Sequence, residues 1–82
     1  MKAGRERKVF RVFGFATTHD ALKAEKALAE SGIAAVPIPT PSVLGAACGI
    51  AMRVAPQNES RARSTLADRG ILVQAEADIE DF

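Results

Sequence analysis

The 82-residue chain is long enough for one domain with a modest core, because a chain of this length buries only about 60–65% of the surface that its unfolded form exposes. Four Phe, no Trp, no Tyr and 48% apolar residues exclude a disordered chain and require a core built mainly from Ala, Val, Ile and Leu. The net charge of +1 argues against a protein that binds nucleic acid by electrostatic attraction.

No apolar run in the sequence approaches the roughly 20 residues that a membrane helix requires. The run at residues 9–16 is interrupted by Arg11 and has no cleavage-like end, so it makes a poor signal-peptide core. The single cysteine, Cys48, cannot form an internal disulfide, which is typical of a reducing compartment. We therefore expect a cytoplasmic protein that binds neither membranes nor nucleic acid.

The N-terminal part of the chain predicts a flexible basic segment, a strand and a helix, in that order. Residues 1–8 are polar and mostly basic, whereas residues 9–16 are rich in Val and Phe, as strands are. Arg11 lies in the middle of this run, so one face of the strand is expected to meet solvent or a partner. Thr17 predicts a helix N-cap with Asp20 at the third helical position, and small apolar residues then recur at helical spacing.

The middle of the chain predicts two strands joined by a long connection. Gly32 ends the first helix, and residues 33–38 predict a strand at an edge of the sheet, because Pro37 has no backbone N–H to donate. Residues 37–47 form the connection, which is stiff in its proline-rich first half and pliable in its second half. Residues 50–54 predict the third strand.

The C-terminal part predicts a second helix and a fourth strand. Asn58 is the expected N-cap of this helix, and Gly70 is its expected end. Residues 71–74 predict the fourth strand. We expect a single domain over residues 9–75, followed by an acidic tail at residues 76–82 that frays.

The two predicted helices end alike, because the sequences at residues 28–33 and 66–71 share Leu-Ala-acid-x-Gly-Ile. This pattern is typical of a helix that stops on a left-handed glycine and turns directly into a strand. The elements therefore form two successive βαβ units. Right-handed crossovers then predict an α+β, ferredoxin-like split βαβ domain (βαββαβ), with a four-stranded antiparallel sheet and two helices on one face.

This fold predicts the surroundings of Cys48. Strands one and three are its central antiparallel neighbours, so Cys48 is expected at the sheet edge where the first helix begins. A helix N-terminus favours a nearby thiolate, and small neighbours leave the sulfur unscreened and let backbone amides approach it. The predicted site consists of the Cys48 thiol and of five residues around it, Thr17, Thr18, His19, Ala47 and Gly49.

Plainer interpretations of these residues remain open. A lone cysteine is often an inert small hydrophobe, and residues 17–20 are also explained by helix capping alone. His19, Asp20 and Cys48 are candidate metal ligands, but they lack a spacing signature, and we expect neither a metal nor a resident cofactor. No phosphate loop, paired carboxylates or Ser/His/Asp spacing is present, so a carrier or binding protein is favoured over a multiple-turnover enzyme.

Several short motifs occur in a specific order. These are Thr-His-Asp-Ala-Leu-Lys-Ala-Glu-Lys-Ala-Leu (18–28), Gly-Ile (32–33), Ile-Pro-Thr-Pro (38–41) and Cys-Gly-Ile-Ala-Met-Arg-Val (48–54). Over about residues 9–75 the chain thereby resembles the small bacterial family described as putative selenium/sulfur carrier protein-like. The resemblance implies that Cys48 holds sulfur or selenium as a transient persulfide-like adduct. Ser42 stands where that family commonly has a basic residue, and Ala46 and Ala47 stand where it has small polar residues.

Two functions follow from these observations. As a carrier, Cys48 would accept sulfur or selenium from a donor protein and hand it to an acceptor protein. As a non-catalytic module, the chain would bind a ligand or form a homodimer through the sheet face that the helices leave open. Phe side chains of the first strand would then make that face apolar, and the cysteine would be structural. Rapid alkylation of Cys48 at neutral pH favours the first function, and labelling only after unfolding favours the second.

Overall fold

The computed structural model of the chain describes residues 8–45 and 47–81, so the flexible N-terminus expected at residues 1–8 lies, apart from Lys8, outside the described residues. No helix in the described ranges has the length and apolar composition that crossing a bilayer requires. The main elements are β1 (Lys8–Gly14), α1 (Thr18–Glu30), β2 (Ala35–Pro39), β3 (Ile50–Val54), α2 (Glu59–Asp68) and β4 (Ala75–Asp81). The short 3₁₀ helices η1 (Ser42–Leu44) and η2 (Pro56–Asn58) precede β3 and α2, respectively.

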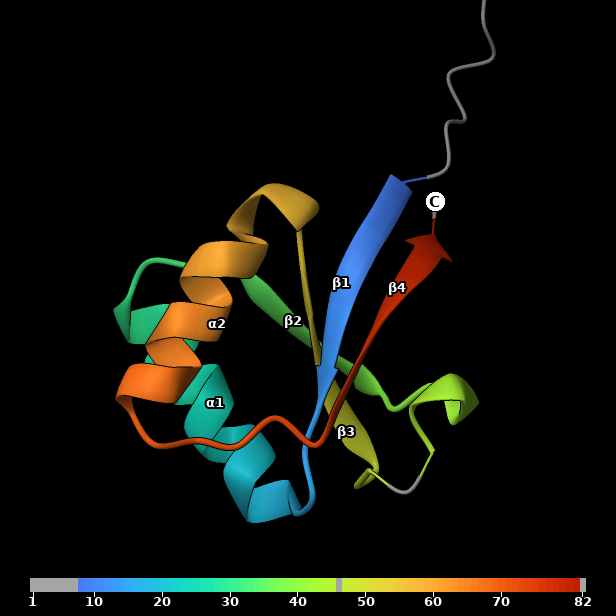
Figure 1. The fold of residues 1–82 in the computed structure, drawn as a ribbon, viewed down its shortest axis with the longest axis horizontal. Coiled ribbons are helices and arrows are strands. Elements are labelled where there is room, and N and C mark those ends of the chain that lie inside the picture. Colours follow the sequence, from blue (N-terminus) through green and yellow to red (C-terminus); the bar gives the residue numbers. More distant parts are fainter. Residues whose placement is uncertain (1–7, 46, 82) are drawn as a thin grey trace, which may run out of the picture.

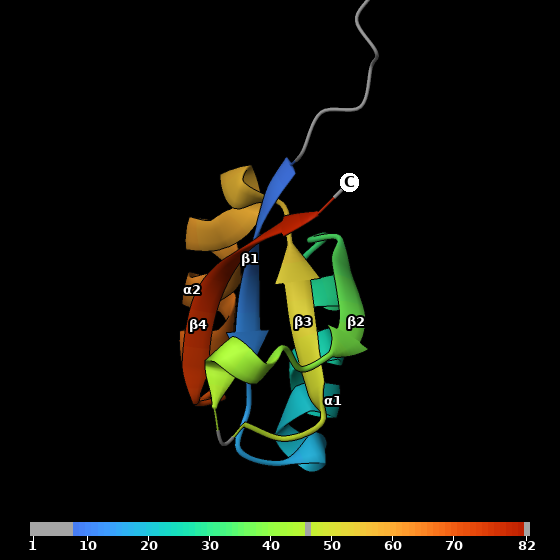
Figure 2. The ribbon, with the colours of Figure 1, turned by 90° about the vertical axis from the view of Figure 1, so that its right-hand side faces the viewer.

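The four strands form one antiparallel sheet in the order β2-β3-β1-β4. Figure 1 shows both helices on one face of this sheet, and Figure 2 shows the strands side by side with β1 and β3 at the centre. The predicted ferredoxin-like α+β fold is therefore confirmed. β2 lies at an edge, as the proline in its sequence predicts.

The main core fills the space between the sheet and the helices. Phe13 of β1 and Met52 of β3 are fully buried there, opposite Leu28 of α1 and Leu66 of α2. Alanines form the rest of the buried face of α1, so this helix lies close to the sheet. Burial of these large side chains removes apolar surface from water and thereby stabilises the fold.

The two helices end in the same way, as their shared sequence predicts. The N–H of Ile33 donates to the Leu28 carbonyl at 2.9 Å. The N–H of Ile71 donates to the Leu66 carbonyl at the same distance. The glycine before each isoleucine has a positive φ, 74° in the first case and 69° in the second, which L residues with a side chain rarely adopt. These are the bonds of a Schellman motif, and the leucine and isoleucine of each pair are buried in the main core.

Thr17 caps α1 as predicted. Its backbone is extended, and its Oγ1 accepts a hydrogen bond from the Asp20 N–H at 3.0 Å. One of the helix's unpaired donors is thereby satisfied, and the acidic side chain of Asp20 lies in the first turn, where the helix dipole favours negative charge.

Replacing Thr17 by alanine is expected to lower the free energy of unfolding by about 1 kcal/mol, because the cap bond is lost. Thr17→Ser keeps the oxygen and should restore most of that stability. Urea denaturation of the three proteins measures the effect, and equal stability of the alanine and serine variants would contradict the capping role.

The start of α2 differs from its prediction. Asn58 precedes the helix, but its side chain makes no capping hydrogen bond. Asn58 instead belongs to η2, which Pro56 begins, and its N–H donates to the Ala55 carbonyl at 2.9 Å. The chain therefore enters α2 through a tight 3₁₀ turn with proline at its first position, where the missing N–H has no helical partner to lose.

The prediction of a strand at residues 71–74 is wrong. The fourth strand is β4, which pairs with β1 from Lys8↔Asp81 to Gly14↔Ala75. Alanine and isoleucine alternate with acidic residues along β4, and this period of two is the pattern of a strand. Residues 76–81, expected as a fraying tail, therefore form an edge strand whose acidic side chains discourage further strand pairing.

Arg11 explains why this acidic strand is stable. Its guanidinium contacts Glu76 at 2.7 Å and Asp78 at 3.0 Å on β4. Arg63 of α2 bonds to the same Glu76 and to Glu59. The side of β1 that carries Arg11 was expected to meet solvent or a partner. Instead Arg11 pairs opposite the buried Val54, on the face that carries the helices, and its partners are acidic residues of this chain.

The long connection between β2 and β3, called the β2–β3 loop, covers part of the second face of the sheet (Figure 2). Leu44 of η1 is buried there against Val12 and Ala51. A Cβ at Gly14 would lie 3.0 Å from both the Ala47 Cβ and the Leu44 Cδ1, so a side chain at this position would push the loop away. The glycine of β1 thus permits the close approach of the loop that carries Cys48.

Candidate functional site

The backbone on both sides of Cys48 is held by neighbouring segments. The Cys48 N–H donates to the Phe15 carbonyl at 2.6 Å, which ties it to the chain leaving β1. The Cys48 carbonyl accepts a hydrogen bond from the Thr40 hydroxyl, which ties it to the chain leaving β2. The Thr40 N–H also donates to the Gly49 carbonyl at 3.1 Å. Cys48 therefore lies where the ends of β1 and β2 meet the start of β3.

The Cys48 side chain is half-buried and packs against the main core. Its thiol donates a hydrogen bond to the Ile50 carbonyl, with 3.3 Å between the sulfur and the oxygen. Only a protonated thiol can make this bond, because a thiolate has no proton to donate and the carbonyl oxygen repels it. Deprotonation of Cys48 would therefore break this hydrogen bond.

The topology brings Cys48 to the chain that leads into α1, as predicted. Phe15, its backbone partner, is two residues before the cap residue Thr17. Thr18 and His19 occupy the first turn of α1 and are exposed. Among the hydrogen bonds and ion pairs of the described residues, none joins His19 to Cys48. The shared edge is confirmed, whereas a direct role of Thr17, Thr18 or His19 at the sulfur stays a prediction.

The two small neighbours of Cys48 have different surroundings. Ala47 packs against Gly14 and against the buried cluster of Val12, Leu44 and Ala51, so it anchors the loop to the sheet. Gly49 is exposed, and a Cβ built there would meet no atom within 4 Å. Gly49 also lines a shallow apolar hollow of about 250 Å³ together with Ile50 and residues 37–39. The backbone at Gly49 is therefore open to solvent, whereas the accessibility of the Cys48 sulfur stays a prediction.

The residues considered as metal ligands are not grouped. No three His, Cys, Asp or Glu side chains within residues 8–45 and 47–81 are arranged as ligands of one ion. His19, Asp20 and Cys48 all belong to these ranges, so we do not propose a metal centre built from them.

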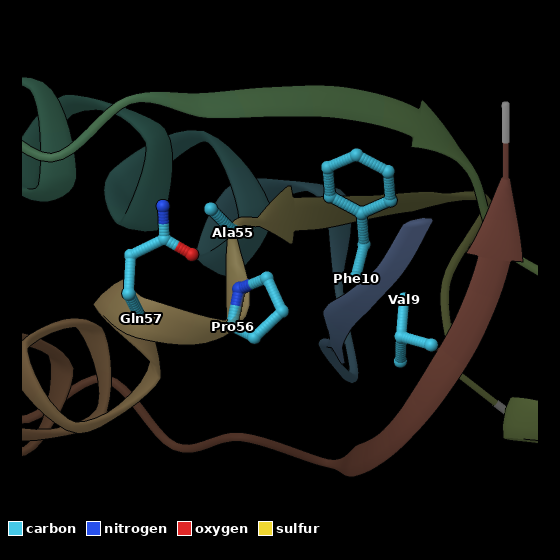
Figure 3. A pocket seen from close by; sticks show the side chains of 5 residues that line it. All are labelled: Val9, Phe10, Ala55, Pro56 and Gln57. Atoms are coloured by element: carbon cyan, nitrogen blue, oxygen red, sulfur yellow. The ribbon is translucent and has the colours of Figure 1, made fainter. Parts of the chain in front are cut away.

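A second hollow lies beside the start of β1, at the other end of this strand from Phe15 and Cys48 (Figure 3). It has a volume of about 410 Å³ and is lined by Val9, Phe10, Ala55, Pro56 and Gln57. None of these side chains titrates or acts as a nucleophile, so this pocket offers no group for acid–base or covalent chemistry.

The sheet face opposite the helices is only partly open. Of the two Phe residues of β1, Phe13 points into the main core, and only Phe10 lies on this face. The guanidinium of Arg53 stacks over the Phe10 ring, 4.3 Å from its centroid. Val36 is 43% exposed beside them, while the β2–β3 loop covers the other half of the face. A homodimer through this face stays a prediction.

Thr40 is the residue of the site that the sequence-based prediction missed. It belongs to the Pro39-Thr40-Pro41 motif, which was noted for its stiffness and for the family resemblance but not for the threonine side chain. A hydroxyl between two prolines, directly after the strand that neighbours the one following Cys48, was the available signal. The two prolines cannot donate backbone hydrogen bonds, so Thr40 provides the donors of this segment.

Comparisons with known proteins give one match. The model of a family described as "Putative Se/S carrier protein-like" matches residues 11–76 of the chain. No curated protein matches, and no solved structure matches.

Proposed function

The chain belongs to the Putative Se/S carrier protein-like family, and we propose from this premise that Cys48 is a carrier thiol for sulfur or selenium. The observation that supports the proposal best is the setting of Cys48, the only cysteine of the chain. It lies at the end of the β2–β3 loop, half-buried, with backbone bonds to Phe15 and Thr40 and with the exposed Gly49 next to it. A defined backbone beside an exposed glycine suits a handover between two proteins.

The proposed step is a transfer between thiols. The Cys48 thiolate attacks the outer sulfur of a persulfide on a donor protein, and an S–S bond forms at Cys48. The S–S bond of the donor breaks, and the donor leaves as a thiolate, so no external oxidant or reductant is consumed. An acceptor thiolate then attacks the same outer sulfur, and Cys48 leaves as a thiolate. With selenium, the donor is a selenopersulfide and the atom transferred is selenium.

The absence of a second cysteine favours transfer between proteins. A second thiol in the chain could attack the persulfide of Cys48 and release sulfide with formation of an internal disulfide. This chain has one cysteine, so that side reaction is excluded and the adduct persists until an acceptor arrives. A donor and an acceptor protein are therefore the proposed partners, in the reducing cytoplasm where thiols stay free.

Mass spectrometry of the intact protein tests the proposal. Treating the native, reduced protein with glutathione persulfide is expected to add about 32 Da, and glutathione selenopersulfide about 79 Da, with both adducts removed by dithiothreitol. Cys48→Ser is expected to gain neither mass, which is a complete loss of the adduct. Serine has nearly the shape of cysteine, so thermal denaturation should show that the variant is folded.

The opposite outcome is equally clear. If the native protein gains no adduct while the unfolded protein does, Cys48 is a structural residue. The non-catalytic binding or dimerisation module then becomes the better interpretation. Sedimentation of the protein with and without Phe10→Glu would test the homodimer, because a charge on the second sheet face should dissociate it.

A further inference from the structure

The edge strand β2 has backbone groups that face β3 and backbone groups that face outward. The Thr40 N–H, directly after β2, donates to the Gly49 carbonyl at 3.1 Å, so the backbone of this residue faces β3. In an antiparallel strand, the N–H and carbonyl groups face the same neighbour at every second residue. Val36 and Ile38 therefore direct these groups toward β3.

The alternate residues of β2, which are Ala35, Pro37 and Pro39, direct their backbone groups away from β3. Figure 2 shows β2 as the outermost strand, and no other strand of the described residues pairs with it on that side. Proline has no N–H, so both prolines stand where no bond to β3 is lost. The outer edge of β2 therefore offers a carbonyl oxygen at each of these positions but an N–H only at Ala35.

A second strand could not pair well with this edge. In an antiparallel pair, two residues that face each other across an outer edge exchange one N–H···O bond in each direction. If the β2 strands of two copies met with Pro37 opposite its own equivalent, neither bond of that pair could form. Pro39 would then lie opposite Ala35, and only the alanine could donate. Each proline ring would also occupy the place of the missing hydrogen, against the carbonyl of the added strand.

We propose that Pro37 and Pro39 close the outer edge of β2 to strand addition by a second copy of this chain. An open edge strand with exposed apolar side chains is a template for pairing, and Val36 of this strand is 43% exposed. The opposite edge strand, β4, carries acidic residues instead of prolines. Two copies that associate therefore use a surface other than the outer edge of β2.

Sedimentation of the double variant Pro37→Thr/Pro39→Thr tests this proposal. Threonine restores both N–H groups, is favoured in strands and adds no large apolar group. The dissociation constant for self-association should fall by at least about tenfold relative to the unchanged protein, because several hydrogen bonds become possible and each represents a factor of about 2–10. Pro37→Thr and Pro39→Thr alone should each give a smaller decrease.

Pro41→Thr is the matched control. Pro41 lies after β2, at the start of η1, so its replacement creates no donor on the strand edge and should leave the dissociation constant within about twofold. Equal self-association of the double variant and the unchanged protein would overturn the proposal, and so would an equal increase by Pro41→Thr. Circular dichroism shows whether the double variant is folded, and the two single variants carry the same test if it is not.

Hydrogen exchange of the unchanged protein tests the direction of the backbone groups without any variant. The Val36 and Ile38 amides should be protected, whereas the Ala35 amide should exchange freely, and the opposite pattern would overturn the proposal. In the double variant, the new amides at positions 37 and 39 should become protected as the protein concentration rises, which identifies the β2 edge as the contact. The proposal is independent of Cys48, so the absence of a persulfide adduct would leave it standing.

Discussion

Replacing Phe13 by alanine is expected to lower the free energy of unfolding by about 3–5 kcal/mol, which is much of the stability of a small domain. Phe13 is fully buried at the centre of β1 and packs in the main core between the sheet and both helices. Truncation removes its apolar surface from the core and leaves a cavity that the neighbouring strands cannot fill. Urea denaturation followed by circular dichroism measures the loss.

Phe10→Ala is the matched control, because it removes the same side chain from the same strand. Phe10 lies on the second face, half-buried, under the guanidinium of Arg53. Its loss should cost about 1 kcal/mol, from the stacking with Arg53 and a smaller buried surface. Similar losses for the two variants would contradict the assignment of the main core to the helix-covered face.

Replacing Glu76 by glutamine is expected to cost about 1–2 kcal/mol at neutral pH, after allowance for the solvent around its partners. Glu76 accepts hydrogen bonds from both Arg63 and Arg11, and so joins β4 to α2 and to β1. Glutamine keeps the shape but loses the charge that both guanidinium groups contact. Asp78→Asn, which loses one exposed contact with Arg11, should change stability by less than about 0.5 kcal/mol.

The effect of Glu76 should depend on pH in a defined direction. The hydrogen bonds from Arg63 and then Arg11 lower the pKa of its carboxyl below the ordinary value of 4.5, against the opposing effect of burial. A lowered pKa in the folded state contributes stability above the unfolded pKa, and this contribution is lost as the pH falls through the folded pKa. The stability difference between the unchanged protein and Glu76→Gln should therefore be constant near pH 7 and shrink below about pH 4.5. A difference that grows as the pH falls below about 4.5 would contradict this account.

The local signals of the sequence were sufficient for most of the fold. The Thr17 cap, the glycines at both helix ends and the Val-rich runs each describe a few neighbouring residues, and the structure confirms them. Their order along the chain then leaves few topologies, because βαβ crossovers are right-handed. The strand order and the meeting of β1 with the segment before β3 follow from this rule.

The errors arose where distant residues decide the structure. In isolation, Ile71-Leu-Val-Gln74 is the better strand, because it is rich in β-branched and apolar residues. The acidic residues of β4 are stable in a strand because Arg11 and Arg63 face them, and no local pattern reports those partners. The same holds for Gly14, whose role depends on the β2–β3 loop lying above it.

For the site, the sequence was sufficient for Cys48 and its sheet edge but not for the direction of its sulfur. The Cys48 backbone is bonded to Phe15 and to Thr40, which belong to other segments of the chain, and its side chain packs on the main core. The hydrogen bond from the Cys48 thiol to the Ile50 carbonyl could not be predicted from the sequence either. Whether it forms depends on the backbone angles of the residues between the two groups. The sequence could name the candidate thiol, whereas the contacts around it required coordinates.

The strand order has a consequence for synthesis of the protein. β1 is synthesised first among the strands, whereas both of its hydrogen-bonding neighbours, β3 and β4, are synthesised later. The carboxylate that pairs with Arg11, that of Glu76, lies 65 positions further along the chain. At a translation rate of roughly 5–20 residues per second, this Phe-containing segment stays unpaired for a few seconds on the ribosome. During that interval its apolar side chains stay exposed, and the sheet can form only after most of the chain has emerged.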